Sequence, residues 1–149
     1  MGTLDGLLVV SLEQAVAAPF VSSRLADAGA RVIKIERPEG DFARNYDDVV
    51  KGHSAYFVWL NRGKESIAMD LRQPSEISLL KSMLEKADVL IENFKTGSLQ
   101  KIGLDLTEIR KANPRLITCS ISGYGSQGDW AEMKAYDLLI QAETAIASI

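Results

Sequence analysis

Basic side chains follow several apolar runs of this sequence, at positions where a sheet protein could hold a phosphorylated ligand. Arg37 follows one run, Arg72 follows another, Lys95 and Lys101 flank the exit of a third, and Lys134 precedes the last apolar segment. Guanidinium and ammonium groups form charge-assisted hydrogen bonds with phosphate oxygens, and the arginine fork matches two oxygens at once. Any one of these residues alone fits an ordinary surface charge. As a converging set they predict a site for a polyanion.

The loop around Phe94 adds an aromatic ring to this basic set. Asn93, Phe94 and Lys95 come directly after the apolar run at 89–91, and Gly97 marks a turn. A ring in such a loop either stacks on a nucleotide base or packs beneath the loop as a hydrophobic staple. The sequence leaves both interpretations open.

A second polar pair, Tyr136 and Asp137, stands at the start of the last apolar segment. It follows Gly123-Tyr124-Gly125, whose glycine amides would allow a ligand to approach the backbone closely. Asp137 is either a group that takes part in chemistry or a first-turn acid that complements the helix dipole.

Other chemistries lack their sequence signature. The loop at 13–19 contains no glycine, whereas the dinucleotide fingerprint G-x-G-x-x-G should follow the first strand, so a nicotinamide cofactor is disfavoured. Glu36 stands where an acid that binds ribose would lie, although Glu36 and Arg37 equally fit a solvated loop pair. His53 is the only histidine and has no cysteine or acid at ligand spacing, so no metal site is predicted.

The composition of the 149-residue chain is that of a globular domain, with 46% hydrophobic and 25% charged residues. A net charge of −3 argues against a general nucleic-acid binder. The single cysteine, Cys119, excludes an intrachain disulfide framework and is expected to be a buried structural thiol. No apolar run reaches the roughly 18 residues of a membrane span, and the N-terminus lacks a signal-peptide pattern. We therefore expect a cytoplasmic protein that does not enter a membrane.

Alternating strands and helices must position the candidate residues. Strands are predicted at 7–10, 32–35, 66–71, 89–91 and 116–121, and helices at 19–28, 75–86, 107–113 and 136–149. This alternation predicts an α/β fold with an open, mostly parallel sheet and helices on both faces. The loops after the strands would then meet at one edge of the sheet, where open α/β folds bind ligands.

Segments along nearly the whole sequence resemble the N-terminal part of the family III (CaiB/BaiF) CoA-transferases, which include formyl-CoA transferase and the α-methylacyl-CoA racemases. They include L-A-D-A-G-A-R-V-I-K-I-E-R-P-E-G-D, N-R-G-K-E-S-I-A-M-D-L, A-D-V-L-I-E-N-F-K-T-G-S-L-Q-K-I-G-L, N-P-R-L-I-T-C-S-I-S-G-Y-G and A-Y-D-L-L-I-Q-A. The resemblance implies a Rossmann-like fold in which residues 1–149 form the N-terminal part of the large CoA-binding domain. The small domain and the returning C-terminal segment would be absent.

The resemblance also implies which residues contact coenzyme A, the substrate. Val16 and Ala17 would line the adenine or pantetheine path, and Arg37 would meet the 3′-phosphate region. The nucleotide would be bordered by residues of two further loops, with two lysines nearby: Met69, Leu71, Arg72, Asn93, Phe94, Lys95, Lys101 and Lys134. The sequence departs from the family at Ala18, where glycine is usual, and at Lys101, where arginine is common.

The reaction implied by the resemblance moves CoA between an acyl-CoA and a free carboxylic acid. It passes through a mixed anhydride and then a thioester on an aspartate. That aspartate would lie beyond residue 149, so Tyr136 and Asp137 are expected only to support the chemistry, and the chain alone is expected to be inactive. Racemases carry a histidine where Tyr136 stands, and a phenol with an ordinary pKa near 10 is a poor base at neutral pH.

A transferase is therefore favoured, and the stretches at 40–47 and 135–141 resemble members that act on small dicarboxylic acids such as itaconate, mesaconate or succinate. A 2-methylacyl-CoA racemase and a non-catalytic CoA-binding fragment remain alternatives. Full-length members interlock as homodimers, so a homodimer is expected for the full-length protein. The sequence stops within an apolar pattern at 145–149 without a helix-terminating residue, which leaves a truncated protein and a stand-alone product as open alternatives.

Overall fold

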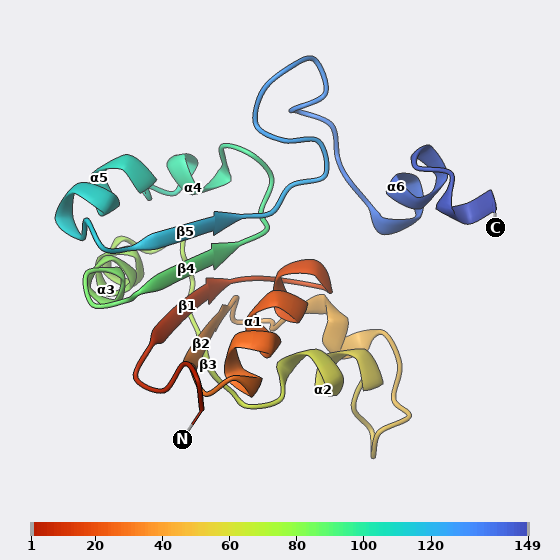
Figure 1. Ribbon diagram of the computed structural model, residues 1–149, viewed down its shortest axis with the longest axis horizontal. Coiled ribbons are helices and arrows are strands. Elements are labelled where there is room, and N and C mark those ends of the chain that lie inside the picture. The colour runs from red at the N-terminus through yellow and green to blue at the C-terminus, as the bar shows by residue number, and fades with distance from the viewer. Residues whose placement is uncertain (1, 149) are drawn as a thin grey trace.

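The computed structural model describes residues 2–148 as a five-stranded, all-parallel sheet with helices on both faces (Figure 1). The strands are β1 (Leu8–Leu12), β2 (Arg31–Glu36), β3 (Lys64–Ala68), β4 (Val89–Glu92) and β5 (Ile117–Ser120). They lie in the order β3-β2-β1-β4-β5. The predicted α/β fold with a parallel sheet is confirmed.

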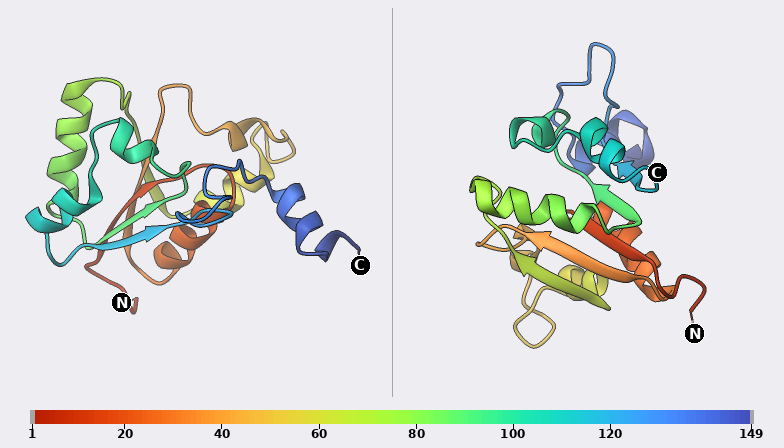
Figure 2. Two further views of the ribbon diagram at one scale, coloured as in Figure 1. Left: turned by 90° about the horizontal axis from the view of Figure 1, so that it is seen from above. Right: turned by 90° about the vertical axis from the view of Figure 1, so that its left-hand side faces the viewer.

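The helices form one layer on each face of the sheet (Figure 2). One layer holds α1 (Ala17–Asp27) and α2 (Ala55–Asn61), and the other holds α3 (Pro74–Leu84), α4 (Ser98–Lys101) and α5 (Leu106–Ala112). Two short 3-10 helices are η1 (Phe42–Asn45) and η2 (Ile146–Ser148), and α6 (Asp137–Glu143) stands away from the sheet.

Two apolar clusters explain why both faces are covered. Neighbouring residues of a strand point to opposite faces, and Val9 and Val10 are both fully buried. Val10 belongs to a cluster with Leu80 of α3, whereas Val9 belongs to a cluster with Ala18 of α1. The continuous apolar run of β1 is therefore the pattern of a parallel strand covered on both sides.

Two predicted elements end at the wrong residue. The strand predicted at 66–71 ends at Ala68, because the carbonyl of Asp70 accepts a hydrogen bond from Gln73 and turns the chain into α3. The helix predicted at 136–149 ends at Glu143, because Ala145 adopts a left-handed φ of 61° before η2. Residue 149 lies outside the described residues. The other predicted elements agree with the observed ones to within about two residues at each end.

The strand order determines where a ligand can enter. β1 lies at the centre between β2 and β4, and the chain leaves β1 toward α1 but leaves β4 toward α4 on the opposite face. The loops after β1 and β4 therefore diverge at the carboxyl edge of the sheet. In open α/β sheets, ligands bind in the crevice at such a switch point.

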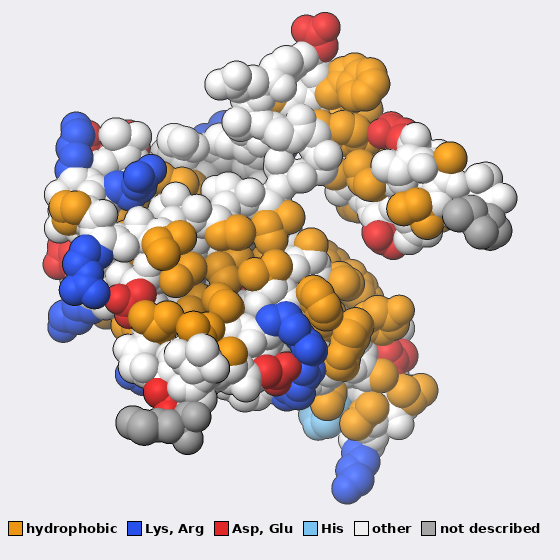
Figure 3. Space-filling view, viewed as in Figure 1, with side chains coloured by type: hydrophobic (Ala, Val, Ile, Leu, Met, Phe, Trp, Pro, Cys, Tyr) orange, Lys and Arg blue, Asp and Glu red, His pale blue; other side chains and the backbone are white. Residues whose placement is uncertain are grey.

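One face of the molecule is rich in apolar side chains, which gather over α1, α2 and the adjoining part of the sheet (Figure 3). Phe20, Tyr56 and Trp59 on these helices are each about half exposed. Cys119 of β5 is half-buried rather than fully buried as expected, because β5 is the edge strand. Among residues 2–148, no helix has the length and apolar character of a membrane span.

Candidate binding site at the carboxyl edge of the sheet

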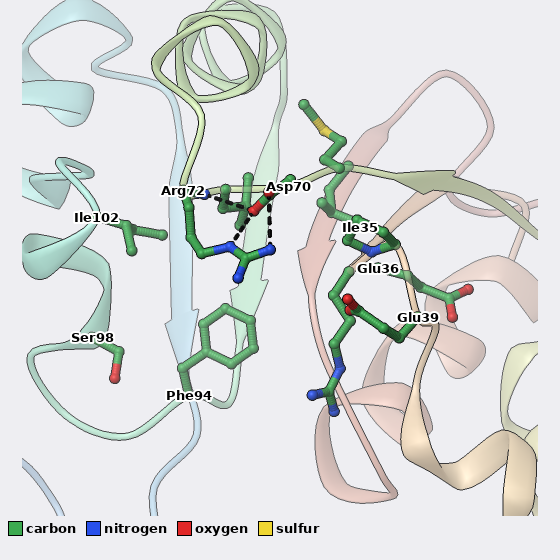
Figure 4. A pocket seen from close by; sticks show the side chains of 12 residues that line it. Ile35, Glu36, Glu39, Asp70, Arg72, Phe94, Ser98 and Ile102 are labelled. Carbon is green, nitrogen blue, oxygen red and sulfur yellow. Dashed lines mark hydrogen bonds and ion pairs between the residues drawn. The ribbon is translucent and has the colours of Figure 1, made fainter.

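A cavity of about 480 Å³ opens at the carboxyl edge of the sheet (Figure 4). This volume is in the range of small-molecule sites in proteins. Three segments line it, from the ends of β2 and β3 and from the loop after β4: Ile35, Glu36, Arg37, Pro38, Glu39, Met69, Asp70, Leu71, Arg72, Phe94, Ser98 and Ile102. Five residues predicted to contact a nucleotide therefore share one cavity, namely Arg37, Met69, Leu71, Arg72 and Phe94.

Phe94 and Arg72 point toward each other across this cavity (Figure 4). The Phe94 ring is partly exposed and also packs against the apolar cluster beneath α3 and α4. Its backbone amide donates to the carboxylate of Glu92, which fixes the loop as it leaves β4. The ring is thus both an apolar anchor of its loop and a free surface on which a planar group could stack.

Arg72 is already paired within the site. Its Nε and Nη2 donate to the two carboxylate oxygens of Asp70 at 2.7 and 3.0 Å. These hydrogen bonds and the guanidinium charge lower the pKa of Asp70 to about 2, and the carboxylate in turn raises the pKa of Arg72. The ion pair of Arg72 and Asp70 has no net charge. It therefore offers the cavity hydrogen-bond donors of the guanidinium group more than a positive charge.

Arg37 provides a cation that no carboxylate neutralises. Its Nε donates to the carbonyl of Gly40 at 3.1 Å, and its guanidinium lies 5.9 Å from the centre of the Phe42 ring. Across residues 2–148 it makes no ion pair. The exposed guanidinium therefore retains donors for an anionic ligand at the mouth of the cavity.

Glu36 is not a solvated partner of Arg37, and that interpretation is wrong. Its carboxylate is buried and accepts two hydrogen bonds from Arg44, at 2.7 and 2.9 Å, and one from Ser66 at 2.6 Å. Burial alone would raise the pKa of Glu36, but the bonds from Arg44, Ser66 and the Asp41 amide lower it to about 2. Because protein donors occupy both oxygens, Glu36 shapes the cavity wall rather than offering free acceptors for ribose.

The loop between β1 and α1 lies outside this cavity. Val16 and Ala17 are exposed at the start of α1, and no side chain caps the first turn of that helix. Ala15 just before them has a left-handed φ of 63°. The amide side chain of Asn93 bonds to the backbone of Gln14 in both directions, at 3.0 and 2.9 Å. Asn93 thus joins this loop to the end of β4 and does not line the cavity.

The three predicted lysines do not converge on the cavity with Arg37 and Arg72. Lys95 forms an ion pair with Glu132 at 2.8 Å, and the charge of Lys101 also acts on Glu132, whose pKa is lowered chiefly by the bond from Lys95. Lys134 is exposed in the same stretch that precedes α6. Lys95 in the loop after β4 and Lys101 at the end of α4 therefore lie beside the segment at 122–135, and Lys134 belongs to that segment.

Tyr136 and Asp137 begin α6. Tyr136 is 63% exposed, and the carboxylate of Asp137 accepts a hydrogen bond from Gln141 one turn later. Asp137 lies in the first turn, which agrees with its interpretation as an acid that complements the helix dipole. Neither side chain lines the cavity.

Sequence reasoning missed a buried polar cluster next to the site. Lys34 lies within the apolar run of β2, yet its side chain is only 1% exposed and its ammonium group contacts Asp41 at 2.7 Å. Glu13 and Lys64, which form a second buried pair at 2.7 Å, belong to the same cluster. A lysine within an otherwise apolar strand was the available signal, because such a residue must find a buried partner.

Metal ligands are not gathered at this site. Within residues 2–148, no group of three or more histidine, cysteine, aspartate or glutamate side chains is placed to hold a metal ion.

Comparison with known proteins identifies relatives over almost the whole chain. Residues 4–149 match the model of the CoA-transferase family III. The chain is 44% identical to an acetyl-CoA:oxalate CoA-transferase of Acetobacter aceti over 97% of its length, and 41% identical to a succinate–glutarate CoA-transferase of Agrobacterium fabrum over 98%. In each case it covers 38% of the relative.

Solved structures show the same fold. A CaiB/BaiF family protein from Brucella suis superposes with a TM-score of 0.91 at 45% identity, covering 97% of this chain and 40% of that one. A hypothetical protein from Mycobacterium tuberculosis superposes with a TM-score of 0.92 at 34% identity, covering 100% of this chain and 42% of that one. The chain thus spans about two fifths of the length of the relatives it matches.

Proposed function

Because the chain belongs to the CoA-transferase family III, we propose that the cavity at the carboxyl edge of the sheet binds the nucleotide end of coenzyme A. The observation that carries this proposal is the joint placement of Phe94, Arg37 and Arg72 around one cavity. An aromatic ring suits the adenine base, and guanidinium groups suit its phosphates. The proposed protein activity is the transfer of CoA between an acyl-CoA and a free carboxylic acid.

The charges around the cavity support a specific orientation of the nucleotide. Arg37 has no carboxylate partner among the described residues, so it is assigned to the 3′-phosphate. The apolar side chains of Met69, Leu71 and Ile102 line the cavity together with the Phe94 ring, and this half suits the adenine. The pantetheine arm would then run toward the exposed start of α1 at Val16 and Ala17.

The lysines extend this proposal beyond the cavity. Lys95 and Lys101 lie beside the segment at 122–135 and Lys134 lies within it, and their charges would favour the diphosphate bridge of coenzyme A. The ion pair between Lys95 and Glu132 is exposed, so it would break at small cost when a phosphate replaces the carboxylate.

The proposed chemistry follows the family resemblance. A carboxylate nucleophile would attack the acyl-CoA thioester, release CoA as thiolate and form a mixed anhydride. The thiolate would then attack the enzyme carbonyl of this anhydride, which releases the donor acid and gives an enzyme thioester. The acceptor carboxylate would attack that thioester, form a second mixed anhydride and release CoA thiolate again. Attack of this thiolate on the acyl carbonyl would give the new acyl-CoA and free the enzyme carboxylate. The nucleophilic aspartate is proposed to lie beyond residue 149, and Tyr136 and Asp137 would support it from the start of α6.

Small dicarboxylic acids are the proposed acceptors. The two relatives described above are named for oxalate, succinate and glutarate, which are all of this class. Tyr136 further favours a transferase over a racemase, since a phenol is a weak base at neutral pH. By the same resemblance we propose a homodimer for the full-length protein, and the cytoplasm is the location proposed from the sequence.

An exchange experiment tests the function. The protein, together with the segment that is proposed to follow residue 149, would be incubated with acetyl-CoA or succinyl-CoA and an isotopically labelled dicarboxylic acid, and the thioesters would be measured by mass spectrometry. Label that appears in a new acyl-CoA supports the transferase. Exchange of the α-proton of a 2-methylacyl-CoA in heavy water, without transfer of CoA, would instead identify a racemase. CoA binding with neither reaction would identify a non-catalytic CoA-binding module.

A further inference from the structure

A buried polar cluster lies between the loop after β1 and the loop after β2. Four charged side chains alternate in sign through it. Asp41 contacts Lys34 at 2.7 Å, Lys34 lies 3.7 Å from Glu13, and Glu13 contacts Lys64 at 2.7 Å. Each of these side chains is at most 2% exposed. The cluster is electrically neutral as a whole.

The remaining polar atoms of the cluster are satisfied by neighbours. Asn61 accepts hydrogen bonds from both ammonium groups, at 2.9 Å from Lys34 and 3.3 Å from Lys64. The second oxygen of Glu13 accepts from the hydroxyl groups of Ser11 and Ser22. Every buried side-chain nitrogen and oxygen between residues 2 and 148 has a hydrogen-bond partner.

Stability alone does not explain such a cluster. Removing two charges from water costs free energy that their attraction only partly returns, and apolar residues of similar volume often replace a buried ion pair without loss. Burial lowers the pKa of Lys64, partly offset by Glu13, which reflects this cost. The contacts of Asp41 point to a second role of the cluster, which is to hold a backbone turn.

The backbone at 14–15 is held by side chains from two sides. One oxygen of Asp41 faces Lys34, and the other accepts the amide hydrogens of Ala15 at 3.2 Å and Ala43 at 3.0 Å. From the opposite side, the side chain of Asn93 holds both the amide and the carbonyl of Gln14. Ala15 has a left-handed φ of 63°, a conformation that residues other than glycine adopt only when neighbouring contacts enforce it.

We propose that Asp41 and Asn93 are positioning residues for the turn at 14–15. By holding this turn in its left-handed conformation, they set the position of Val16 and Ala17, the start of α1. The effect on coenzyme A rests on the function proposed above, which places these two residues along the pantetheine path. The hold on the turn itself does not depend on any ligand.

Lys34 supports this arrangement through its contact with Asp41. Its ammonium group contacts one oxygen of Asp41 at 2.7 Å, while the other oxygen accepts two amide hydrogens at once. An asparagine at 41 would keep one side-chain oxygen facing those amides but would leave the ammonium group of Lys34 without its main partner. Removing both charges while keeping an acceptor oxygen at position 41 would preserve the hold on the turn.

Two double variants separate the hold on the turn from the buried charges. Lys34→Met/Asp41→Asn removes both charges and keeps an acceptor for Ala15, whereas Lys34→Met/Asp41→Ala removes the charges and the acceptor. Both leave Glu13 and Lys64 paired. We expect the first to bind CoA within about threefold of the wild type and the second to bind at least about tenfold more weakly, at similar melting temperatures.

Amide hydrogen exchange of Ala15, followed by NMR, supplies a readout that a merely structural role would not move. We expect protection of this amide to be lost in the alanine double variant and kept in the asparagine double variant, with unchanged protection in β1 and β2. Equal protection of Ala15 in the two variants would overturn the proposal. Equal CoA affinity of the two variants would overturn the claim that the turn positions Val16 and Ala17 for CoA.

The proposal can still be tested if the wild-type protein does not bind CoA or if the alanine double variant does not fold. If the wild-type protein does not bind CoA, the proposed function fails, and hydrogen exchange at Ala15 still decides the positioning role. If the alanine double variant does not fold, Asn93→Ala replaces it, because that change leaves all buried charges in place. It is expected to expose the amide of Gln14 to exchange, and retained protection there would refute the proposal.

Discussion

The variant Arg37→Ala should weaken the binding of coenzyme A more than the binding of dephospho-coenzyme A, which lacks the 3′-phosphate. Arg37 lines the cavity and makes no ion pair among residues 2–148, and the only hydrogen bond of its side chain there is to the Gly40 carbonyl. Its removal therefore breaks little within the protein. A selective effect on one ligand would report the contact with the 3′-phosphate.

The size of the effect follows from the exposure of this residue. A hydrogen bond to a charged group is worth about 1.5–3 kcal/mol, and each 1.4 kcal/mol corresponds to a tenfold change in Kd. Because the guanidinium is exposed, water and salt weaken the contact, and we expect the lower end of this range, about tenfold near 0.15 M salt. The loss for dephospho-coenzyme A should be less than about threefold.

Calorimetric titration of both ligands at low and high salt provides the assay. The selective effect should shrink as salt rises, because the interaction between exposed charges is screened. Arg110→Ala is the matched control, since Arg110 is an exposed arginine of α5 that does not line the cavity. Equal losses for the two ligands, or an equal effect of the control, would refute the assignment of Arg37 to the 3′-phosphate.

Three further predictions concern the cavity and its support. Phe94→Leu should weaken CoA and dephospho-CoA alike by about threefold to tenfold, since stacking is worth about 0.5–1.5 kcal/mol, and an unchanged affinity for both would exclude Phe94 as the adenine platform. The Glu36 pKa of about 2 lies below its ordinary value of 4.5, so its contribution, at most about 3 kcal/mol, is present above pH 4.5 and lost as the pH falls toward 2. Urea unfolding should therefore show that the stability difference between wild type and Glu36→Gln shrinks over that interval, whereas a constant difference would contradict the pairing with Arg44. Leu80→Ala should cost about 3 kcal/mol of unfolding free energy, because Leu80 is a fully buried side chain by which α3 packs on the sheet. A loss below about 1 kcal/mol would contradict that packing.

The fold could be predicted because its signals are local. The helix α3 was evident from Ile77, Leu80 and Leu84 on one face, and these three residues are buried. The strands were evident as short apolar runs between turns, as expected where both faces of a parallel sheet are covered. The end of α6 was not evident, because the left-handed conformation of Ala145 has no signature in its residue type.

The candidate site could be predicted in part for a similar reason. Arg37, Arg72 and Phe94 each follow a strand or its exit loop, and parallel strands bring such positions to one edge. The partner of each charged residue could not be read in the same way. Glu36 pairs with Arg44 rather than its neighbour Arg37, and Lys34 pairs with Asp41, because tertiary packing decides which groups meet.

A structure of the protein with bound coenzyme A tests the central claim most directly. We predict the adenine ring in contact with the Phe94 ring, at about 4 Å between the nearest carbons, and the 3′-phosphate within hydrogen-bond distance of Arg37. A nucleotide bound away from the cavity lined by Phe94, Arg37 and Arg72 would contradict the account.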